Sequence, residues 1–468
     1  MTTPSRTSSY EPLVRKHGDD VGTPLCSGTA SGKSDRPRRM ARLARLVRGL
    51  GLGLILILFA SHASAESLLF LSTQLTPVDE ADKMRRVILK GFPGEVDFQP
   101  NDNRVVFERL ASEAARGSPR PVLLGGLHGD FVNLIKGGVI DPVDDVMSGL
   151  EDRGFIEGFA KLGKLGRDRQ YYIPWMQATY VMVANRRALK YLPEDADLDS
   201  LTYDQLKAWA ASMQNAEGEA KLGFPAGANG LIHRFFQGYL YPSYTGSTVR
   251  KFRGAEAEAM WRAFRDLWRH VNPNSLAFEH MDEPLLSGEV WVAWDHTARI
   301  LGAFRRRPDD FVAFPVPAGP EGRGFMVVLA GLAIPKEPPN RTASIALIEH
   351  LTRPEVQLTT LRSVGFFPVV RTSGGEKLPP ALALINDAVA KQAASSDALP
   401  GLLPAGLGEK AKEFNSVYLV AFSQIILRGK DIRSVLEKQA RKLHAILSKT
   451  EARCWPPDEP SAGPCPVE

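Results

Sequence analysis

In roughly the first hundred residues after residue 66, the pattern of hydrophobic and polar positions alternates between the period of a β-strand and that of an α-helix. Short apolar or alternating runs predict β-strands, and apolar residues at every third or fourth position predict helices. The predicted strands are SLLFLS, Gly94–Gln99 and Val122–Leu124, and the predicted helices are Asp79–Leu89, Arg104–Arg116 and Phe131–Lys136. Strands and helices that alternate in this way predict a parallel sheet covered by helices.

Two longer apolar segments, Tyr171–Asn185 and Phe325–Pro335, lie between such blocks. A strand that leaves one sheet and enters another would have this length, so we expect the chain to cross between two α/β lobes more than once. Ligands of open α/β sheets bind at the carboxyl ends of strands, and two facing lobes therefore predict a cleft. Further helices are predicted from Leu201, with Thr202 as N-cap, and at Trp261–Val271, Ala343–Thr352, Glu413–Leu427 and Ile432–Leu447.

The stretch LLSGEVWVAWDHTARI, residues 285–300, combines an alternating pattern with two tryptophans, an acid and a histidine. The alternation over Glu289–Asp295 predicts a buried strand that ends in a loop. We expect Trp291 and Trp294 on one face of this strand, with Trp291 in the core and Trp294 nearer the end of the strand.

The N-terminal 65 residues have the pattern of an export signal. Arginines precede the apolar run Gly49–Ala60, and the small residues Ala63-Ser64-Ala65 form a cleavage motif. We expect residues 40–65 to be a signal peptide, the true start to be Met40, and residues 1–39 to be a disordered or wrongly assigned extension. The apolar run is shorter than the roughly 20 residues of a membrane span, so a membrane-anchored form is only the alternative.

The net positive charge of the chain comes from this N-terminal segment. Residues 1–65 carry ten Lys and Arg against four Asp and Glu, whereas the remainder carries 48 basic and 49 acidic residues. A nearly neutral folded part lacks the clustered basic surface that nucleic acids require. Nucleic acid is therefore not an expected partner.

Cysteine usage agrees with export. The chain after residue 65 contains only Cys454 and Cys465, which lie in the Pro-rich tail, residues 451–468. An even pair in an oxidising compartment predicts a disulfide that closes this tail, and two free thiols are the alternative.

Motifs of catalysis and metal binding are absent from the sequence. There is no G-x-S-x-G or H-E-x-x-H motif, and the acids of HMDE at residues 280–283 have no second His or Cys at ligand spacing. Paired carboxylates for glycoside hydrolysis stay possible, but no pair stands out. The sequence itself thus offers no motif for catalysis and no metal site.

Polar side chains recur where predicted strands end. Amides, acids and hydroxyls of this kind bind the hydroxyl groups of a sugar, and an aromatic face packs on the apolar face of its ring. Each of these residues taken alone could equally be a turn or cap residue, and Asn101-Asp102-Asn103 could be an N-cap cluster before the next helix. The groups are Ser72-Thr73-Gln74, Asn101-Asp102-Asn103, His128 with Asp130, Trp175 with Gln177, and Asp295.

The chain resembles the extracellular solute-binding proteins of bacterial ABC importers, in the carbohydrate-binding family that includes maltose-binding protein. The blocks that carry the resemblance follow in the family's order between residues 66 and 450: PVLLGGLHGDFVNLIKGGVIDPVDDV, YYIPWMQATYVMVANRRAL, LTYDQLKAWAASM, LLSGEVWVAWDHTA, DDFVAFPVPAGPEGRGFMVVLAGLAIPK and IALIEHLTRPEVQLTTLRSVGFFPVV. The resemblance implies a two-lobed α/β fold with a hinged cleft, an exported monomer, and a membrane permease as partner. It also implies no catalysis and no cofactor.

The resemblance predicts lobe 1 as residues 66–177 plus 330–375 and lobe 2 as residues 178–329 plus 376–450. It places the ligand between the lobes, against the residues at the strand ends and the GFFP block. The predicted ligand-binding residues are Ser72, Thr73, Gln74, Asp102, His128, Asp130, Trp175, Gln177, Trp294, Asp295 and Arg362. The family's pattern often has a tryptophan where this chain has Ala298, so Trp294 or Trp175 would have to serve as the stacking platform.

These features together predict a periplasmic binding component that captures a sugar or related polyol. A secreted glycan-acting hydrolase is the first alternative. The second is a binding protein for a non-sugar anion such as a phosphorylated polyol, for which Arg299, Arg362 or His128 would serve as anion partners.

Overall fold

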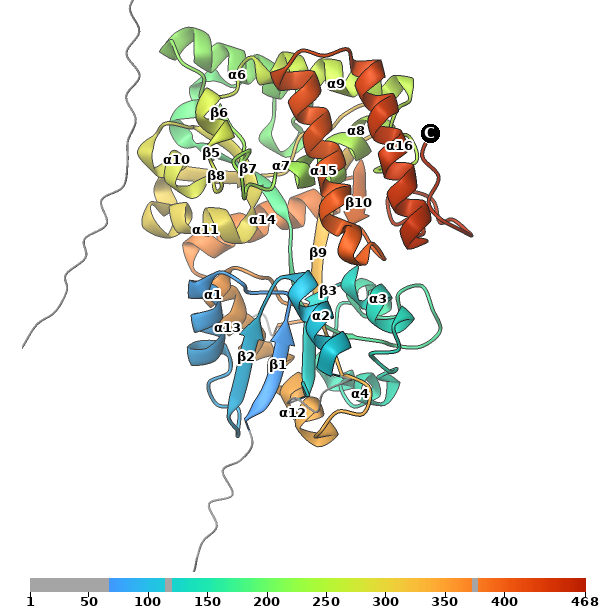
Figure 1. Ribbon diagram of the computed structural model, residues 1–468. Coiled ribbons are helices and arrows are strands. Elements are labelled where there is room, and N and C mark those ends of the chain that lie inside the picture. Colours follow the sequence, from blue (N-terminus) through green and yellow to red (C-terminus); the bar gives the residue numbers. More distant parts are fainter. Residues whose placement is uncertain (1–66, 114–119, 373–377) are drawn as a thin grey trace, which may run out of the picture. The chain divides into compact units, whose positions relative to one another are not determined.

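The computed structural model describes residues 67–113, 120–372 and 378–468. The predicted signal peptide and the N-terminal extension lie outside these residues. The described chain folds around two β-sheets in two lobes: a six-stranded sheet that lies mainly in the first lobe and a four-stranded sheet in the second (Figure 1).

The first sheet begins with three parallel strands, in agreement with the predicted alternation. β1 (Leu68–Ser72) lies between β2 (Val96–Pro100) and β3 (Leu123–Leu127). β9 (Arg323–Ala333) is antiparallel to β3 and also to β4 (Ile173–Ala178). The helices of this lobe are α1 (Val78–Lys83), which continues as a π-helical turn over Met84–Ile88, α2 (Asn103–Glu113), α3 (Asp130–Lys136), α4 (Asp144–Ser148), α5 (Glu157–Leu162), α12 (Arg341–Leu351) and α13 (Pro354–Val364).

The second sheet has the order β6-β7-β5-β8. Its strands are β5 (Tyr180–Asn185), β6 (Leu222–Gly223), β7 (Val292–His296) and β8 (Phe311–Phe314). The helices of this lobe are α6 (Tyr203–Glu217), α7 (Ile232–Phe235), α8 (Tyr241–Thr245), α9 (Ala255–Trp268), α10 (Asp282–Ser287), α11 (Thr297–Arg306), α14 (Pro380–Ala394), α15 (Ala411–Phe422) and α16 (Ile432–Thr450). α6 begins at the predicted cap, since Thr202 and Gln205 form a capping box.

Both long apolar segments pass between the two lobes. The segment Tyr171–Asn185 is divided at Thr179 into β4, in the first sheet, and β5, in the second. The Thr179 hydroxyl donates a 2.8 Å hydrogen bond to the Met326 carbonyl of β9. β9 passes between the lobes, because its first residues pair with β10 (Ala398–Leu402) and its last residues pair with β3 (Figure 1).

The stretch over residues 285–300 differs from its prediction in two ways. The strand starts at Val292 instead of Glu289, and no loop follows it, because α11 begins at Thr297. The helix can begin there because the imidazole Nδ1 of His296 accepts a hydrogen bond from the Ala298 amide at 3.3 Å, as an N-cap does. α14 was not predicted at all.

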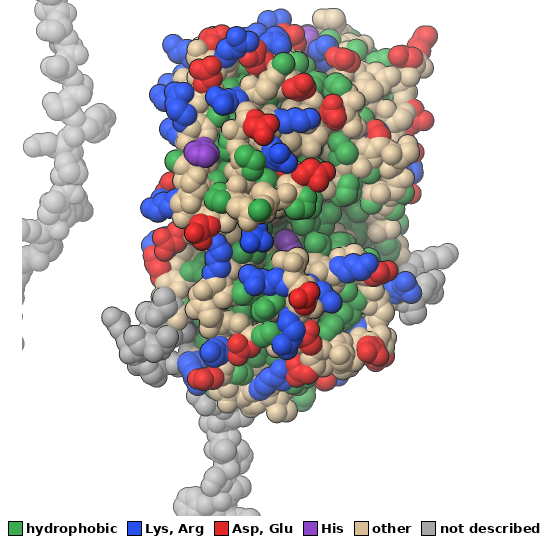
Figure 2. Space-filling model, turned by 90° about the vertical axis from the view of Figure 1, so that its right-hand side faces the viewer, with side chains coloured by type: hydrophobic (Ala, Val, Ile, Leu, Met, Phe, Trp, Pro, Cys, Tyr) green, Lys and Arg blue, Asp and Glu red, His purple; other side chains and the backbone are tan. Residues whose placement is uncertain are grey.

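The C-terminal residues pack onto the second lobe. The predicted disulfide between Cys454 and Cys465 is confirmed. Between these cysteines, the buried Asp458 carboxylate accepts hydrogen bonds from the backbone amides of Thr248, Val249 and Arg250, each at 2.9 Å. Figure 2 shows the side on which α15, α16 and the C-terminus lie; acidic and basic side chains are interspersed there, and hydrophobic side chains gather in a recess beside a histidine.

Candidate ligand-binding site

Asp130 is the residue on which the strand ends of the first sheet converge. Its Oδ2 accepts hydrogen bonds from the Thr73 hydroxyl at 3.0 Å and from the Leu127 amide at 2.9 Å. Its Oδ1 accepts from the Asn103 amide nitrogen at 2.7 Å. Thr73 follows β1, Asn103 follows β2, and Leu127 is the last residue of β3. Parallel strands bring such residues to one edge of a sheet.

Burial raises the pKa of Asp130, and its three hydrogen bonds and the positive charge of Arg234 oppose that rise without cancelling it. Arg234 lies on α7 in the second lobe. Burial lowers the pKa of its guanidinium, while Tyr180 and Asp130 act in the opposite direction. The charges of Asp130 and Arg234 therefore interact across the boundary between the lobes.

No hydrogen bond joins Asp130 to Arg234, both of which the structure describes. The guanidinium Nη1 donates instead to the Gln237 Oε1 at 3.0 Å, and Gln237 in turn donates to Asn415 at 3.0 Å. Asp130 can accept from a further donor, and Arg234 can donate to a further acceptor. A sugar hydroxyl carries both a donor and an acceptor, the two kinds of group that Asp130 and Arg234 would bind.

Arg299 of α11 is a second cation at this boundary. Its Nη1 donates to the Glu279 carbonyl at 2.9 Å. Its charge favours the ionised form of Glu80 on α1, but burial and the charge of Asp79 prevail and raise the pKa of Glu80 to about 7. Beside Arg299 and Arg234, burial chiefly lowers the pKa of His233 far below its usual value, so this imidazole is neutral. Its buried Nδ1 has no hydrogen-bond partner.

The predicted residues after β1 lie next to Asp130. Thr73 bonds it directly, and Gln74 donates through its side chain to the Thr73 carbonyl at 2.9 Å and hydroxyl at 3.1 Å. Ser72 is fully buried, and its Oγ accepts from the Gln74 amide at 2.9 Å. Thr73 and Gln74 are half-buried and can reach a ligand, whereas Ser72 shapes the turn.

Asp102 and His128 lie in different surroundings. Asp102 is exposed, 3.6 Å from the Lys412 ammonium, and the neighbouring Asn103 takes the place beside Asp130. His128 is buried, and its Nδ1 lies 2.7 Å from the Tyr172 hydroxyl. Burial lowers the pKa of His128 to about 4. It is therefore neutral at pH 7 and does not supply the positive charge expected of an anion partner.

The two candidate platforms, Trp175 and Trp294, are completely buried. Trp175 packs on Phe70, with ring centroids 5.7 Å apart, and Trp294 is stacked on Tyr180 at 4.7 Å. Neither ring has a free face to offer in this structure, because the core covers them. Gln177 is half-buried in β4, where its backbone pairs with Phe367.

Asp295 is also an interior residue and not a group at the mouth of a cleft. Its Oδ2 accepts from the Met281 amide at 2.9 Å and its Oδ1 from the His296 amide at 2.7 Å. Burial raises its pKa to about 7. Backbone amides use both oxygens, which indicates that Asp295 holds α10 and α11 against β7 and does not present a free hydroxyl acceptor.

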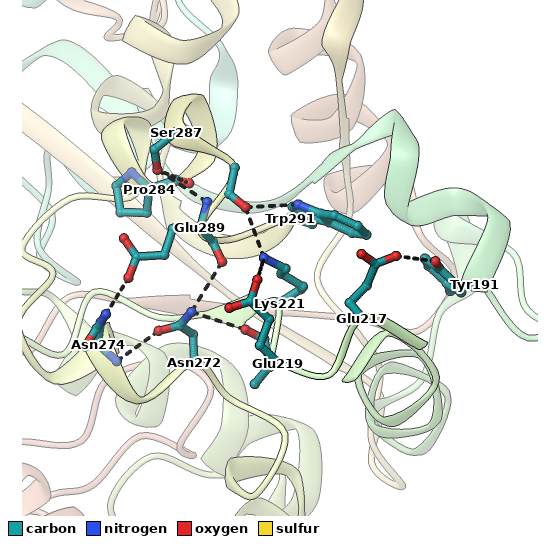
Figure 3. A network of polar contacts seen from close by, with 12 residues as sticks. Tyr191, Glu217, Glu219, Lys221, Asn272, Asn274, Pro284, Ser287, Glu289 and Trp291 are labelled. Atoms are coloured by element: carbon teal, nitrogen blue, oxygen red, sulfur yellow. Dashed lines mark hydrogen bonds and ion pairs between the residues drawn. The ribbon is translucent and has the colours of Figure 1, made fainter. Parts of the chain in front are cut away.

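Trp291 and Trp294 lie on opposite sides of the chain, contrary to the prediction of a shared face. Residues three positions apart in a strand point in opposite directions, and only even separations share a face. Trp291 belongs to a separate network, in which its indole and the Lys221 ammonium donate to the Gly288 carbonyl at 3.0 Å and 3.3 Å (Figure 3). The Arg187 guanidinium lies 5.0 Å from the indole ring.

Arg362 lies in the last turn of α13, where its backbone carbonyl accepts a hydrogen bond from the Arg305 guanidinium of α11. Glu80, His233 and Arg234 also lie at the lobe boundary and were not predicted from the sequence. Arg234 lies on a helix, so a rule based on strand ends could not find it. Its only sequence signal is a His-Arg pair in the otherwise apolar stretch LIHRFFQGYL.

Two negative findings apply to the described residues. They contain no group of three or more His, Cys, Asp and Glu side chains able to hold a metal. None of their helices combines the length and apolar character that crossing a membrane requires.

A family model described as bacterial extracellular solute-binding protein matches residues 80–358. No curated protein sequence matches the chain. Among solved structures, UgpB from Mycobacterium tuberculosis in complex with glycerophosphocholine has a TM-score of 0.65 and 17% identity, covering 82% of this chain and 98% of its own.

Maltose-bound MalE3 from T. maritima has a TM-score of 0.64 and 17% identity, and the match covers 81% of this chain and 100% of MalE3. The sugar-binding protein MalE from Xanthomonas citri has a TM-score of 0.64 and 16% identity, and the match covers 82% of this chain and 98% of MalE. These structures share the two-lobed α/β fold. Because the family model spans more than half of the chain, this protein belongs to the bacterial extracellular solute-binding proteins, as its sequence predicted.

Proposed function

We propose that this protein is the substrate-binding component of an ABC importer, which captures a sugar or related polyol between its lobes and delivers it to a membrane permease. The observation that carries the proposal is the Asp130–Arg234 pair, whose members belong to different lobes and influence each other electrostatically without a direct hydrogen bond. A ligand that bonds to both groups stabilises the arrangement in which the lobes are close. Binding thus shifts the population of conformations toward the closed form.

The chemistry of the site supports a hydroxyl-rich ligand. Thr73 and Asn103 orient the Asp130 carboxylate, which accepts from hydroxyl donors, and the Arg234 guanidinium donates to hydroxyl oxygens. One acid faces one base, so the pair has no net charge and suits a neutral ligand. Two of the similar structures are described as a maltose-bound protein and a sugar-binding protein, which agrees with this class.

A second candidate is a ligand with an anionic group. Arg234 and Arg299 both lie at the lobe boundary, and neither forms an ion pair with a described residue. Half-buried arginines that form no direct ion pair can bind a phosphate or carboxylate. The similar structure of UgpB holds glycerophosphocholine, which carries a phosphodiester as well as hydroxyl groups.

We further propose that the protein is a monomer without catalytic activity, exported to the periplasm by residues 40–65. The lobes are proposed to be residues 66–177 plus 330–375 and residues 178–329 plus 376–450. The end of β4 at Ala178 and the start of β5 at Tyr180 support the first of these boundaries.

The proposal is tested by thermal unfolding of the purified protein in the presence of sugars, polyols and organic phosphates. A ligand at 100 times its dissociation constant should add roughly 2.7 kcal/mol to the free energy of unfolding. Stabilisation by a neutral sugar that Asp130→Asn abolishes supports the first candidate. Stabilisation by phosphorylated compounds alone, weakened by salt and abolished by Arg234→Gln, supports the second. Turnover of chromogenic glycosides would contradict both.

A further inference from the structure

A concave site lies on the outside of the second lobe, between α15 and α16. This α15–α16 groove encloses about 410 Å³, within the range of sites for small organic ligands. It shares no lining residue with the Asp130–Arg234 site. Its inner wall contains the buried apolar side chains of Val417 and Ile446.

One face of α16 supplies most of the polar groups of the groove. Gln439, Lys442, Ile446 and Lys449 follow one another at separations of three or four residues, which places them along one stripe of the helix. The stripe thus presents an amide at one end, two ammonium groups, and an apolar side chain between the ammonium groups.

Gln439 is the first group that points to a ligand. Its side chain is 2% exposed and lines the groove, and its Oε1 has no hydrogen-bond partner. A buried carbonyl oxygen without a donor is costly, so such oxygens are normally paired. An N–H or O–H donor on a bound molecule would satisfy it.

The charges of the groove point to an anionic group on the same molecule. Three lysines and a single acid, Glu413, line it. Glu413 is paired with Lys410, whereas Lys442 and Lys449 form no ion pair with any described residue. Lysine ammonium groups beside an apolar wall favour an anion that carries a hydrocarbon part.

We propose that the α15–α16 groove binds a small amphipathic carboxylate that carries an amide N–H, the chemistry of an N-acyl amino acid. The carboxylate pairs with Lys442 and Lys449, the N–H donates to the Gln439 Oε1, and the hydrocarbon part covers Val417 and Ile446. This binding is independent of the ligand between the lobes.

The test is calorimetric titration of the exported protein with N-hexanoyl-leucine. We expect saturable binding of one molecule with a dissociation constant of about 1 mM or lower. The double variant Lys442→Gln/Lys449→Gln should weaken it at least about tenfold, since two charge-assisted contacts are lost. Arg441→Gln removes an exposed cation of the same helix that does not line the groove, so it is the matched control and should leave the affinity unchanged.

Two further comparisons separate the contributions of the carboxylate and of the amide N–H to the affinity for the probe. The methyl ester of the probe, which lacks the carboxylate, should bind more weakly to the unsubstituted protein. Gln439→Met should weaken the probe but not octanoate, which has no amide. The proposal is overturned if the probe does not bind saturably at concentrations up to about 10 mM, or if the double lysine variant binds it with the original affinity.

Discussion

Asp130 and Arg234 influence each other electrostatically across the two lobes, yet each forms its hydrogen bonds within its own lobe. The carboxylate is held by groups at the ends of three strands, and the guanidinium by the side chain of Gln237. Both groups lose hydration by burial, as the directions of their pKa shifts show. Two partly desolvated, oppositely charged groups with unused hydrogen-bonding capacity are suited to bind a polar ligand that touches both.

Asp130→Asn should reduce the affinity for the ligand by about 10- to 100-fold, because hydrogen bonds to charged groups contribute about 1.5–3 kcal/mol. Asn has nearly the same shape but no charge. Asp102→Asn is the control. Asp102 is exposed and its described ion-pair partner is the exposed Lys412, so this variant should leave the affinity unchanged. Equal affinity of the Asp130→Asn variant and the original protein in a calorimetric titration would exclude Asp130 from the site.

Glu80→Gln should change how the free energy of unfolding depends on pH. The pKa of Glu80 is raised from 4.5 to about 7 in the folded protein, so the folded state binds the proton more tightly than the unfolded state. Its contribution therefore becomes increasingly unfavourable as the pH rises from about 4.5 to 7. We expect the variant to be more stable at pH 8, by about 1 kcal/mol after allowance for solvent screening.

The same Glu80→Gln variant should differ little from the original protein below pH 4.5, where the carboxyl is protonated in both states. The measurement is urea unfolding at pH 4.5, 6 and 8. An effect of Glu80→Gln that does not vary with pH would show that this carboxyl does not titrate in the expected range. Glu108→Gln, an exposed site on α2, serves as the control.

Asp458→Ala should destabilise the protein by about 3–5 kcal/mol. The carboxylate accepts from three consecutive backbone amides and from the Ser247 hydroxyl, and its removal leaves buried donors without partners. The exposed neighbour Glu459 provides the control, because Glu459→Gln should change stability by less than about 0.5 kcal/mol. A small effect in urea unfolding would mean that the tail contributes little to the fold.

Replacing both disulfide cysteines by serine, Cys454→Ser/Cys465→Ser, should cost up to about 3 kcal/mol, the value expected for closing a loop of this length. The loss concerns the tail, so the affinity for the ligand between the lobes should be unchanged. Reduced ligand affinity in this variant would show that the tail influences the site from a distance.

The sequence predicts the fold more completely than the site. Periodicity predicts the strands of the first lobe and both crossings, because buried strands need long apolar runs. It does not show the break at Thr179, which depends on a hydrogen bond to Met326, 147 positions away in sequence. Strand-end polarity correctly brings Thr73 together with Asp130 but cannot reveal Arg234, which a helix of the other lobe supplies.

Asp295 and Trp294 show why local patterns mislead about a site. An acid at the end of a strand can face solvent or bind backbone amides, and the sequence does not distinguish these outcomes. Here the amides of Met281 and His296 use both oxygens of Asp295. Trp294 is likewise an interior residue, because Tyr180 and Tyr239 pack on its ring.

The most direct test of the central claim is calorimetric titration of the exported protein and of its Arg234→Gln variant with a panel of neutral sugars, polyols and organic phosphates. We predict that at least one neutral sugar or polyol binds the original protein saturably with one molecule per chain, and that Arg234→Gln weakens this binding at least about tenfold. Binding of a neutral sugar that is insensitive to Arg234→Gln, or no binding of any member of the panel, would contradict the account.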